Sequence, residues 1–380
     1  MTGCAGNAIG DALCHLVTPS SCHPLTLSSC HLVIKMPRLA VVIVSYNTRE
    51  LLRSCLRSVF ASATRTADRL DVDVIVVDNA SQDGSASMVA HDFPGARLIP
   101  LDDNLGFTGG NNLALTLLGF EISPPNLQSP IAQSSIFNLQ SSISPDYVLL
   151  LNPDAEVQDD GLWRMVAFME EMPDAGACGA RLSYGDGGFQ HGAFRFPGLF
   201  QIGLDLFPLT GLPGAHRLHN SRLNGRYPMA LWMGEQPFLA DFVLGAAMLV
   251  RGEAIRQVGG LDDEFFMYCE EMDWAMRLHE AGWRVYALPA VHVIHHAGQS
   301  SQQVRWPAFV RLWRSRFRFF DKHRRRYPPG YPRLVRVLVR NALALRARQA
   351  RRRFARGLIS GDALADELNA YAVVVNRTRI

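Results

Sequence analysis

Several common sequence signals are missing from this chain, and each absence excludes a class of protein. No apolar run reaches the ~18 to 20 residues that span a bilayer, because the longest candidate, Phe238 to Val250, is interrupted by Asp241. No glycine lies between Met36 and Asp83, so the Gly-x-Gly-x-x-Gly loop of a nicotinamide or flavin enzyme cannot follow the first predicted strand. The phosphate loop of an NTPase and the H-E-x-x-H helix of a zinc protease are also absent.

Cysteine is sparse in the body of the chain. Of the seven cysteines, four lie in the first 35 residues, and Cys55, Cys178 and Cys269 stand far apart in the rest. No C-x-x-C pair occurs and the spacings match no zinc template, which is typical of single buried thiols in a reducing compartment. Residues 1–35 also lack the basic start and unbroken apolar core of a signal peptide. We expect this segment to be disordered or to reflect an over-extended gene start, with Met36 as the true initiator.

Acidic residues are almost absent from one segment near the C-terminus. Between Arg305 and Arg356 there are 18 lysines and arginines and a single acid, Asp321, although the chain of 380 residues has a net charge of only +3. The remainder is therefore acidic. A basic tail on an acidic body is typical of a protein that docks the tail on an anionic surface, and a solvated basic helix would have the same composition.

Apolar runs alternate with helical patterns in the first half of the chain. The predicted strands are the run LAVVIVSYN from Leu39, Val72–Val77, Arg97–Pro100 and Tyr147–Leu151, and a helix is predicted over Arg49–Ala61. The strands lack period-2 alternation, so both of their faces are expected to be covered. This order predicts an α/β fold with a mostly parallel central sheet and flanking helices.

The second half is less regular. The predicted elements are a helix from about Asp160 to Met172, a strand over Phe242–Val250, a helix over Arg251–Val258 and a last strand over Trp283–Leu288. A helix is also expected to begin near Asn111, after a glycine-rich loop. Residues 122–145 are rich in Ser, Gln, Asn and Pro and are interpreted as an inserted surface loop. Residues 183–236 show no clear period and are expected to shape specificity rather than fold.

Polar side chains follow two of the buried strands directly. Asp78 comes after Val77, and Leu151 leads into Asn152, Pro153 and Asp154. Ligands of open α/β sheets bind outside the carboxyl ends of the strands, so these side chains are expected to line a crevice. Their oxygens suit a hard divalent cation on a nucleotide diphosphate, although Asn-Pro-Asp also favours a simple turn.

Six segments, in order, resemble the glycosyltransferases of family 2, which have the GT-A fold. They are VVIVSYN, VIVVDNASQDGS, NLGFTGGNN, LLLNPDAEV, GGLDDEFFMYCEEMDWAMRLHEAGW and VIHHAGQSS. The resemblance is to rhamnosyltransferase-like and galactofuranosyltransferase-like members in particular. It implies a GT-A domain over residues 36–305 with the insertion at 122–145, followed by a basic helical C-terminal region over 306–380. It also implies a dTDP-, UDP- or GDP-linked sugar donor, a Mg²⁺ or Mn²⁺ ion, and inversion at the anomeric carbon.

The resemblance also assigns site residues. Positions implied to bind the donor are Ser45, Tyr46, Asn47, Asp78, Asn104, Gly106 and Asn152. Asn152 and Asp154 stand at the first and last positions of the family's metal-binding DxD-like motif, so this chain has one carboxylate fewer than usual. Asp154 and His295 are implied to contact the metal, with His296, one residue further on, as the alternative.

The implied catalytic base is Glu271, the second acid of CEEMDW, where the family usually has aspartate. An inverting displacement needs a carboxylate that takes the proton of the acceptor hydroxyl as it attacks. Asp273 is the alternative, and a role as an acceptor ligand or a helix cap is also open to it. The helix dipole also stabilises acids in the first turn of a helix, so these acids could be there for stability alone.

The resemblance therefore implies an inverting glycosyltransferase that acts on a glycan or lipid-linked acceptor in cell-surface polysaccharide or glycolipid assembly. The alternative is a catalytically inactive nucleotide-sugar or glycan-binding module, because Asn152 and Glu271 depart from the commonest pattern. No nucleic-acid partner is expected. We expect a cytoplasmic protein, peripheral at the inner face of the cell membrane, where a lipid-linked acceptor would be within reach.

The basic region predicts an amphipathic helix. Arg333, Arg336 and Arg340 share one flank at helical spacing. The adjoining apolar sector contains Leu334, Val337, Leu338, Leu343 and Leu345. Such a helix can lie in a bilayer interface beside anionic headgroups. Packing of the apolar sector on the catalytic domain would explain the pattern equally well.

Overall fold

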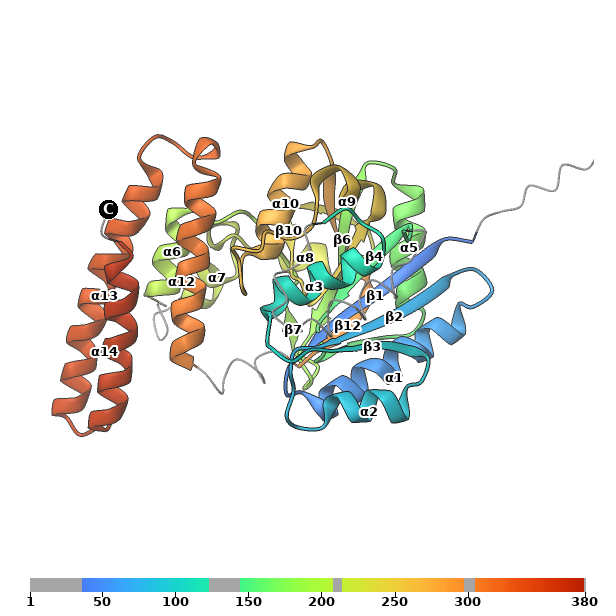
Figure 1. The fold of residues 1–380 in the computed structure, drawn as a ribbon. Helices are drawn as coiled ribbons and strands as arrows, with labels where there is room; N and C mark the ends of the chain where they lie inside the picture. Colours follow the sequence, from blue (N-terminus) through green and yellow to red (C-terminus); the bar gives the residue numbers. More distant parts are fainter. Residues whose placement is uncertain (1–35, 123–143, 208–213, 297–304, 379–380) are drawn as a thin grey trace, which may run out of the picture. The chain divides into compact units, whose positions relative to one another are not determined.

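The computed structural model describes residues 36–122, 144–207, 214–296 and 305–378 (Figure 1). The N-terminal segment 1–35 and nearly all of the predicted loop at 122–145 lie outside the described residues. Contacts divide the chain into two units, residues 1–35 and residues 36–380. All described residues, including the basic C-terminal helices, belong to the second unit.

A ten-stranded sheet of described residues carries the fold, in the order β3-β2-β1-β4-β11-β6-β12-β5, with β7 beside β6 and β9 beside β12. Its strands are β1 (Arg38–Ser45), β2 (Asp71–Asp78), β3 (Ala96–Pro100), β4 (Tyr147–Leu151), β5 (Ala155–Val157), β6 (Ala175–Ser183), β7 (Phe189–Gln190), β9 (Phe238–Ala240), β11 (Ala247–Arg251) and β12 (Arg284–His295). Strands β1 to β4 pair in parallel, as do β6 and β12, and β11 runs antiparallel between β4 and β6. A separate two-stranded sheet joins β8 (Ala193–Phe194) to β10 (Phe242–Val243).

Two apolar cores lie on the two faces of this sheet, which explains the missing period-2 alternation. In β1, Leu39, Val41 and Ile43 point to one core, and the intervening residues point to the other. The first core is covered by α1 (Arg49–Arg65), α2 (Ser85–Asp92) and α5 (Gly161–Glu171). The second is covered by α3 (Gly106–Leu117), α9 (Gly252–Val258) and α10 (Glu270–Glu280). The predicted α/β fold, with a central sheet and flanking helices, is confirmed.

Three boundaries differ from the sequence prediction. The helix after the glycine-rich loop begins at Gly106 rather than near Asn111. The apolar run Phe242–Val250 is not one strand, because the chain leaves the two-stranded sheet after Val243 and enters the main sheet at Ala247. Strand β12 continues to His295 instead of ending at Leu288. Pro289 caused that error: it lies at a register shift between Leu288 and His292, and a bulge tolerates a residue without an N–H.

Residues 183–236, which show no period, form short elements. They are β7, β8, α6 (Leu199–Leu206), α7 (Ala215–His219), the 3-10 helix η1 (Arg222–Asn224) and α8 (Met229–Trp232). Elements of this length present too few residues for a periodic pattern, so packing around buried side chains such as Trp232 holds them in place.

The basic C-terminal region is helical, as predicted. It consists of α12 (Arg305–Lys322), the 3-10 helix η2 (Arg324–Arg326), α13 (Tyr331–Ala355) and α14 (Gly361–Asn376). Helix α14 lies against both α12 and α13 (Figure 1). No helix among the described residues combines the length and the hydropathy needed to cross a membrane.

The predicted apolar sector of α13 is divided between the interior and the surface. Leu343 is buried and Leu338 packs against the core, whereas Leu334, Val337 and Leu345 are 51%, 41% and 47% exposed. Both interpretations of the sector therefore keep some support.

Candidate active site

Asn152, Asp154 and His295 meet at one point, although β12 is far from β4 in the sequence. The Nε2 atom of His295 lies 3.3 Å from Asp154 Oδ1 and 3.2 Å from Asn152 Nδ2. Strand β5 produces this meeting, because it pairs Ala155 with His295 in register, directly after Asp154. Asp154 and His295 are only 6% and 7% exposed. The structure thus brings together the two residues implied to bind a metal and the first residue of their motif.

Gln190, in β7, holds the ring of His295 from the other side. Its Oε1 atom lies 3.1 Å from His295 Nδ1, a contact that favours the tautomer with the proton on Nδ1. The Nε2 lone pair can then accept from the Asn152 amide at 3.2 Å and also faces Asp154 Oδ1 at 3.3 Å, where a cation between the two acceptors would be stabilised. This donor set fits a divalent cation. Among the described residues no three His, Cys, Asp or Glu side chains form a metal cluster, so other ligands would have to complete the shell.

The alternative histidine, His296, has a different partner. Its Nε2 atom lies 2.9 Å from Glu156 Oε1, while its backbone N–H donates to the carbonyl oxygen of Asp154. The geometry therefore favours His295 over His296 as the residue beside Asp154. The Glu156 carboxylate contacts His296, so it does not join Asp154 and His295 as a second carboxylate.

The predicted donor-binding residues at the ends of β1 and β2 lie side by side. Ser45 pairs in register with Asp78. Asp78 is buried, and its Oδ2 atom accepts from the Ser81 backbone, whereas Oδ1 has no hydrogen-bond partner among the described residues. A buried acceptor without a donor is costly, so a ligand N–H or O–H at this oxygen would relieve it.

The three residues implied at the end of β1 differ in what their side chains do. The Ser45 hydroxyl is buried and lies 2.9 Å from the Thr48 hydroxyl, which fixes the turn into α1. Asn47 has a left-handed φ of 51° and accepts from the backbone N–H of Gln82, joining this turn to the loop after β2. Tyr46 is 48% exposed, and of the three it is the side chain most available to a ligand.

Asn104 and Gly106 start helix α3 at the same edge. The Asn104 side chain accepts from the Gly106 N–H, and Gly106 has a φ of +75°, which favours glycine. A Cβ atom at Gly106 would lie 2.5 Å from the backbone oxygen of Phe266. The missing side chain therefore lets the segment before α10 approach this loop.

Glu271 lies in the first turn of α10 with unusual surroundings. Its Oε2 atom is buried and has no partner among the described residues, and burial raises the pKa of Glu271 to about 7. Burial and the charge of Glu271 raise the pKa of its neighbour Glu270 well above its ordinary value. A carboxylate poised near neutral pH is suited to general base catalysis.

Backbone strain precedes this pair of acids. Tyr268 and Cys269 both have left-handed φ angles, 73° and 67°, which are uncommon for residues with side chains. Strain of this kind persists where the surrounding structure imposes it, often at functional sites.

Gly245 connects Glu271 to the metal-site residues. A Cβ atom at Gly245 would lie 3.9 Å from Glu271 Cβ, and the next residue, Ala246, accepts a backbone hydrogen bond from Asn152. The candidate base and the end of β4 therefore face the same part, residues 245–246, of the three-residue segment between β10 and β11.

Asp273 is enclosed by cations. It is fully buried, its Oδ2 atom accepts from Arg277 Nε at 2.9 Å, and its Oδ1 atom lies 2.7 Å from Lys322 Nζ and 2.8 Å from His323 Nε2. Burial alone would raise its pKa, but hydrogen bonds from His323 and Lys322 and the charge of Arg277 lower the pKa of Asp273 to about 2. This geometry gives Asp273 the role of a clamp between α10 and α12.

A cavity of about 330 Å³ adjoins the metal-site residues, and sequence reasoning missed it. Gln190 lines it together with His191, Phe194, Asn220 and Arg226. The Asn220 Oδ1 atom lies 3.2 Å from His191 Nε2 and accepts from Arg226 at 2.8 Å. Only the position of Gln190 in an aperiodic segment after β6 could have suggested it, and that signal is weak.

Two family models match this chain, one before and one after the segment that contains Asn152, Asp154 and Gln190. Residues 40–117 match the model "Glycosyl transferase family 2", and residues 215–364 match "Glycosyl transferase family group 2". An N-acetylglucosaminyl-diphospho-decaprenol L-rhamnosyltransferase of Mycobacterium tuberculosis is 27% identical over 263 residues, which is 69% of this chain and 77% of that protein. Rhamnosyltransferase WbbL of Escherichia coli is 37% identical over 86 residues, which is 23% of this chain and 33% of that protein.

Among solved structures, a mannosyltransferase of Pyrobaculum calidifontis in complex with GDP-Man and Mn²⁺ aligns with a TM-score of 0.48 at 16% identity. The alignment covers 91% of this chain and 89% of that one.

Proposed function

The chain is a family 2 glycosyltransferase similar to rhamnosyltransferases, and on this premise we propose that it transfers a sugar, with inversion, to a glycan carried on a lipid diphosphate. The observation that carries the proposal is the convergence of Asn152, Asp154 and His295 at the end of β4, together with a Glu271 whose pKa lies near neutrality and which faces the same segment, residues 245–246, as Asn152. Because two relatives are rhamnosyltransferases, a deoxyhexose such as rhamnose is the first donor sugar to test, as its dTDP-, UDP- or GDP-linked form.

The nucleotide is proposed to bind over the ends of β1 and β2. The free Oδ1 atom of Asp78 would accept from an N–H of the base or from a ribose hydroxyl, because it is buried without another donor among the described residues. Asn47 and Asn104 shape the two loops on either side through their backbone contacts. Tyr46 is exposed and available to the base.

The diphosphate is proposed to lie beside Asp154. Asp154 and His295 would hold a Mg²⁺ or Mn²⁺ ion there, with Gln190 fixing the tautomer of His295 and the Asn152 amide nitrogen 3.2 Å from His295 Nε2. When bound, such an ion neutralises charge that develops on the leaving diphosphate. Because Asp154 is the single carboxylate of this set, phosphate oxygens are needed to complete the shell.

The base is proposed to be Glu271. As the acceptor hydroxyl oxygen bonds to the anomeric carbon, the bond from that carbon to the diphosphate oxygen breaks, and the hydroxyl proton passes to the Glu271 carboxylate. The nucleoside diphosphate leaves with the electron pair. Attack from the side opposite the leaving group inverts the anomeric carbon.

A sugar ring is proposed to occupy the cavity beside Gln190. Aromatic side chains such as Phe194 and Tyr184 line this cavity with the polar groups of Asn220 and Arg226, a combination that stacks on a ring and hydrogen-bonds to its hydroxyls. Burial lowers the pKa of His191, and the charge of Arg226 adds to this, so His191 is neutral there at physiological pH.

Helix α13 is proposed to rest on the inner face of the cell membrane. Leu334, Val337 and Leu345 form an exposed apolar stripe at helical spacing, and Arg333 and Arg340 are exposed beside it. Arg336 does not take part, because it pairs with Asp321 and lies over the ring of Phe317.

The test of the base is the substitution Glu271→Gln. It should lower turnover by ~10²-fold or more, the usual scale for a lost general base, while donor binding stays nearly unchanged. In the unchanged protein, kcat/KM should rise with pH until the pH passes about 7, because only the ionised Glu271 accepts the proton. The variant should lack this rise.

Glu270→Gln is the matched control. Burial and the charge of Glu271 raise the pKa of Glu270 and favour its neutral form, so a glutamine of similar shape should be tolerated there and should preserve turnover. Equal losses in the two variants, or near-normal turnover of Glu271→Gln, would remove Glu271 from the role of base.

A further inference from the structure

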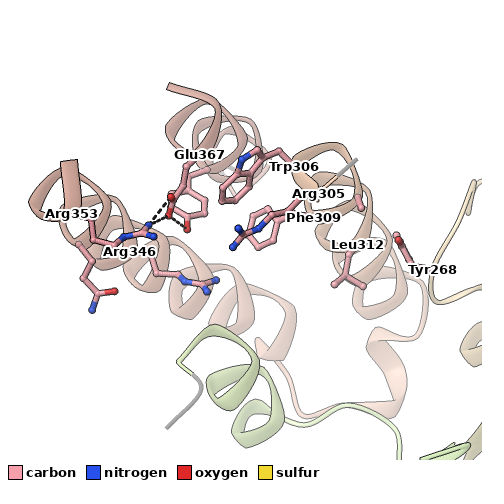
Figure 2. A pocket seen from close by; sticks show the side chains of 11 residues that line it. Tyr268, Arg305, Trp306, Phe309, Leu312, Arg346, Arg353 and Glu367 are labelled. Carbon is pink, nitrogen blue, oxygen red and sulfur yellow. Dashed lines mark hydrogen bonds and ion pairs between the residues drawn. The ribbon is translucent and has the colours of Figure 1, made fainter. Parts of the chain in front are cut away.

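A cavity of about 830 Å³ lies among the three C-terminal helices, apart from the strand-end site (Figure 2). Helix α12 contributes Arg305, Trp306 and Phe309 from its first two turns, α13 contributes Arg346, and α14 contributes Tyr371. These side chains come from one face of each helix, and Figure 2 shows them around a common space. Its volume is in the range of sites that bind organic ligands.

The cavity has a surplus of positive charge. Arg353 is neutralised, because it donates to both carboxylate oxygens of Glu367 at 2.7 and 2.8 Å, and Glu367 also accepts from the Tyr371 hydroxyl. Arg305 and Arg346 have no carboxylate within ion-pair distance among the described residues. Two guanidinium groups are therefore left for an anion, and their planar geometry suits phosphate oxygens.

The same cavity has an aromatic wall. The rings of Trp306 and Phe309 both contact that of Tyr371, at centroid distances of 5.8 and 5.7 Å, and Leu312 extends the apolar surface along α12. A small inorganic anion would leave this wall unused. A ligand with an anionic head and an apolar chain would use both parts.

The cavity reaches the segment that carries the candidate base. Tyr268 lines it and precedes Glu271 by three residues, a separation of at most about 11 Å between Cα atoms. Helix α12 is fixed to this segment, since the Ser315 hydroxyl donates to the Met267 carbonyl at 2.9 Å. A ligand held between the helices would therefore lie near the acceptor side of the reaction.

We propose that this cavity binds the prenyl diphosphate of a lipid-linked acceptor, with Arg305 and Arg346 on the diphosphate and Trp306, Phe309 and Tyr371 against the first prenyl units. The inference rests on the proposed function for its choice of ligand. It assigns to the C-terminal helices a part in acceptor recognition, in addition to any contact of α13 with a membrane.

Direct binding of farnesyl diphosphate to the full chain tests the proposal. Titration calorimetry in EDTA avoids metal-dependent binding at the strand-end site. Arg346→Gln should weaken binding by at least about tenfold, the scale of one lost charge-assisted hydrogen bond, and Arg305→Gln should act similarly. Arg348→Gln is the matched control, because Arg348 is exposed on the same helix and does not line the cavity. Melting temperatures should be alike in all three variants.

Two further ligands separate the sources of affinity. Inorganic pyrophosphate and farnesol should each bind more weakly than farnesyl diphosphate, because each uses one part of the cavity. Pyrophosphate that binds as tightly as farnesyl diphosphate, or equal effects of Arg346→Gln and Arg348→Gln, would overturn the proposal.

The measurement needs no turnover, so its outcome is independent of the proposed function. Failure of prenyl diphosphate binding in this cavity would leave the proposed sugar transfer at the strand-end site untouched. If sugar transfer failed, the calorimetry would still decide whether the cavity binds a prenyl diphosphate.

Discussion

Replacing Asp273 by asparagine should separate a structural clamp from a catalytic base. The side chain is fully buried and contacts Arg277, Lys322 and His323 at 2.7 to 2.9 Å. The substitution keeps the shape of the side chain and removes its charge. It therefore leaves three donors, two of them permanently charged, around a neutral amide.

The expected cost follows from the burial of the partners. Removing one member of a buried ion pair costs about 3–5 kcal/mol. Arg277 and Lys322 retain 19% and 29% exposure, so water would partly solvate them and the lower end, about 3 kcal/mol, applies. For a chain of this size we expect the melting temperature to fall by roughly 5 °C or more.

The dependence on pH gives a second check. Because the pKa of Asp273 is lowered to about 2 in the folded chain, its contribution is complete above the ordinary aspartate pKa of about 3.9 and is lost as the pH falls toward 2. The stability difference between the unchanged protein and Asp273→Asn should be constant from pH 5 to neutrality and should shrink below about pH 4.

Circular dichroism thermal unfolding measures the stability, and initial rates well below the melting temperature measure activity. Asp273→Asn should have a lower melting temperature but keep most of its turnover at low temperature. Glu271→Gln should keep its melting temperature and lose most of its turnover. An unchanged melting temperature together with a ~10²-fold loss of turnover would refute the clamp and make Asp273 the base.

Two further predictions concern the metal and the membrane. Asp154→Ala should abolish transfer and weaken nucleotide-sugar binding more in Mn²⁺ than in EDTA, and equal losses in both conditions, measured by calorimetry, would remove Asp154 from the metal shell. The full chain should co-sediment with anionic vesicles and be released by high salt, and a variant with Arg333→Gln, Arg340→Gln and Leu334→Ser should bind far less. Binding that is absent at low salt, or unaffected by these substitutions, would leave α13 a purely structural helix. Substitution is preferable to truncation, because Val335 and Val339 of α13 are buried against the other helices.

Much of the sheet could be predicted because its strands carry strong local signals. Leu39 to Val44 are apolar throughout since both faces of β1 are covered. Asp78 is the last residue of β2 and Asn152 directly follows β4, at the edge where ligands bind. The GT-A resemblance brought Asp154 and His295 together, and the structure shows how: β5, only three residues long, pairs with β12. No periodicity reveals a strand of that length.

The parts that the sequence did not predict depend on contacts between distant segments. Gln190 lies in a two-residue strand, and only its distance from His295 shows a role. Lys322 and His323 belong to the basic region, and nothing near them in the chain indicates Asp273 as their partner. Ion pairs and hydrogen bonds of this kind have no pattern along the sequence, because folding alone brings the partners together.

The central claim, inverting transfer of a sugar to a lipid-linked acceptor, is tested most directly by the product. The purified chain would be incubated with Mn²⁺, a panel of dTDP-, UDP- and GDP-linked sugars and an N-acetylglucosaminyl-diphosphate lipid, followed by mass spectrometry and NMR. We predict an acceptor heavier by one sugar, with the anomeric configuration opposite to that of the donor. Retained configuration, or binding of a nucleotide sugar with no transfer under any of these conditions, would contradict the account, and the second result would favour an inactive binding module.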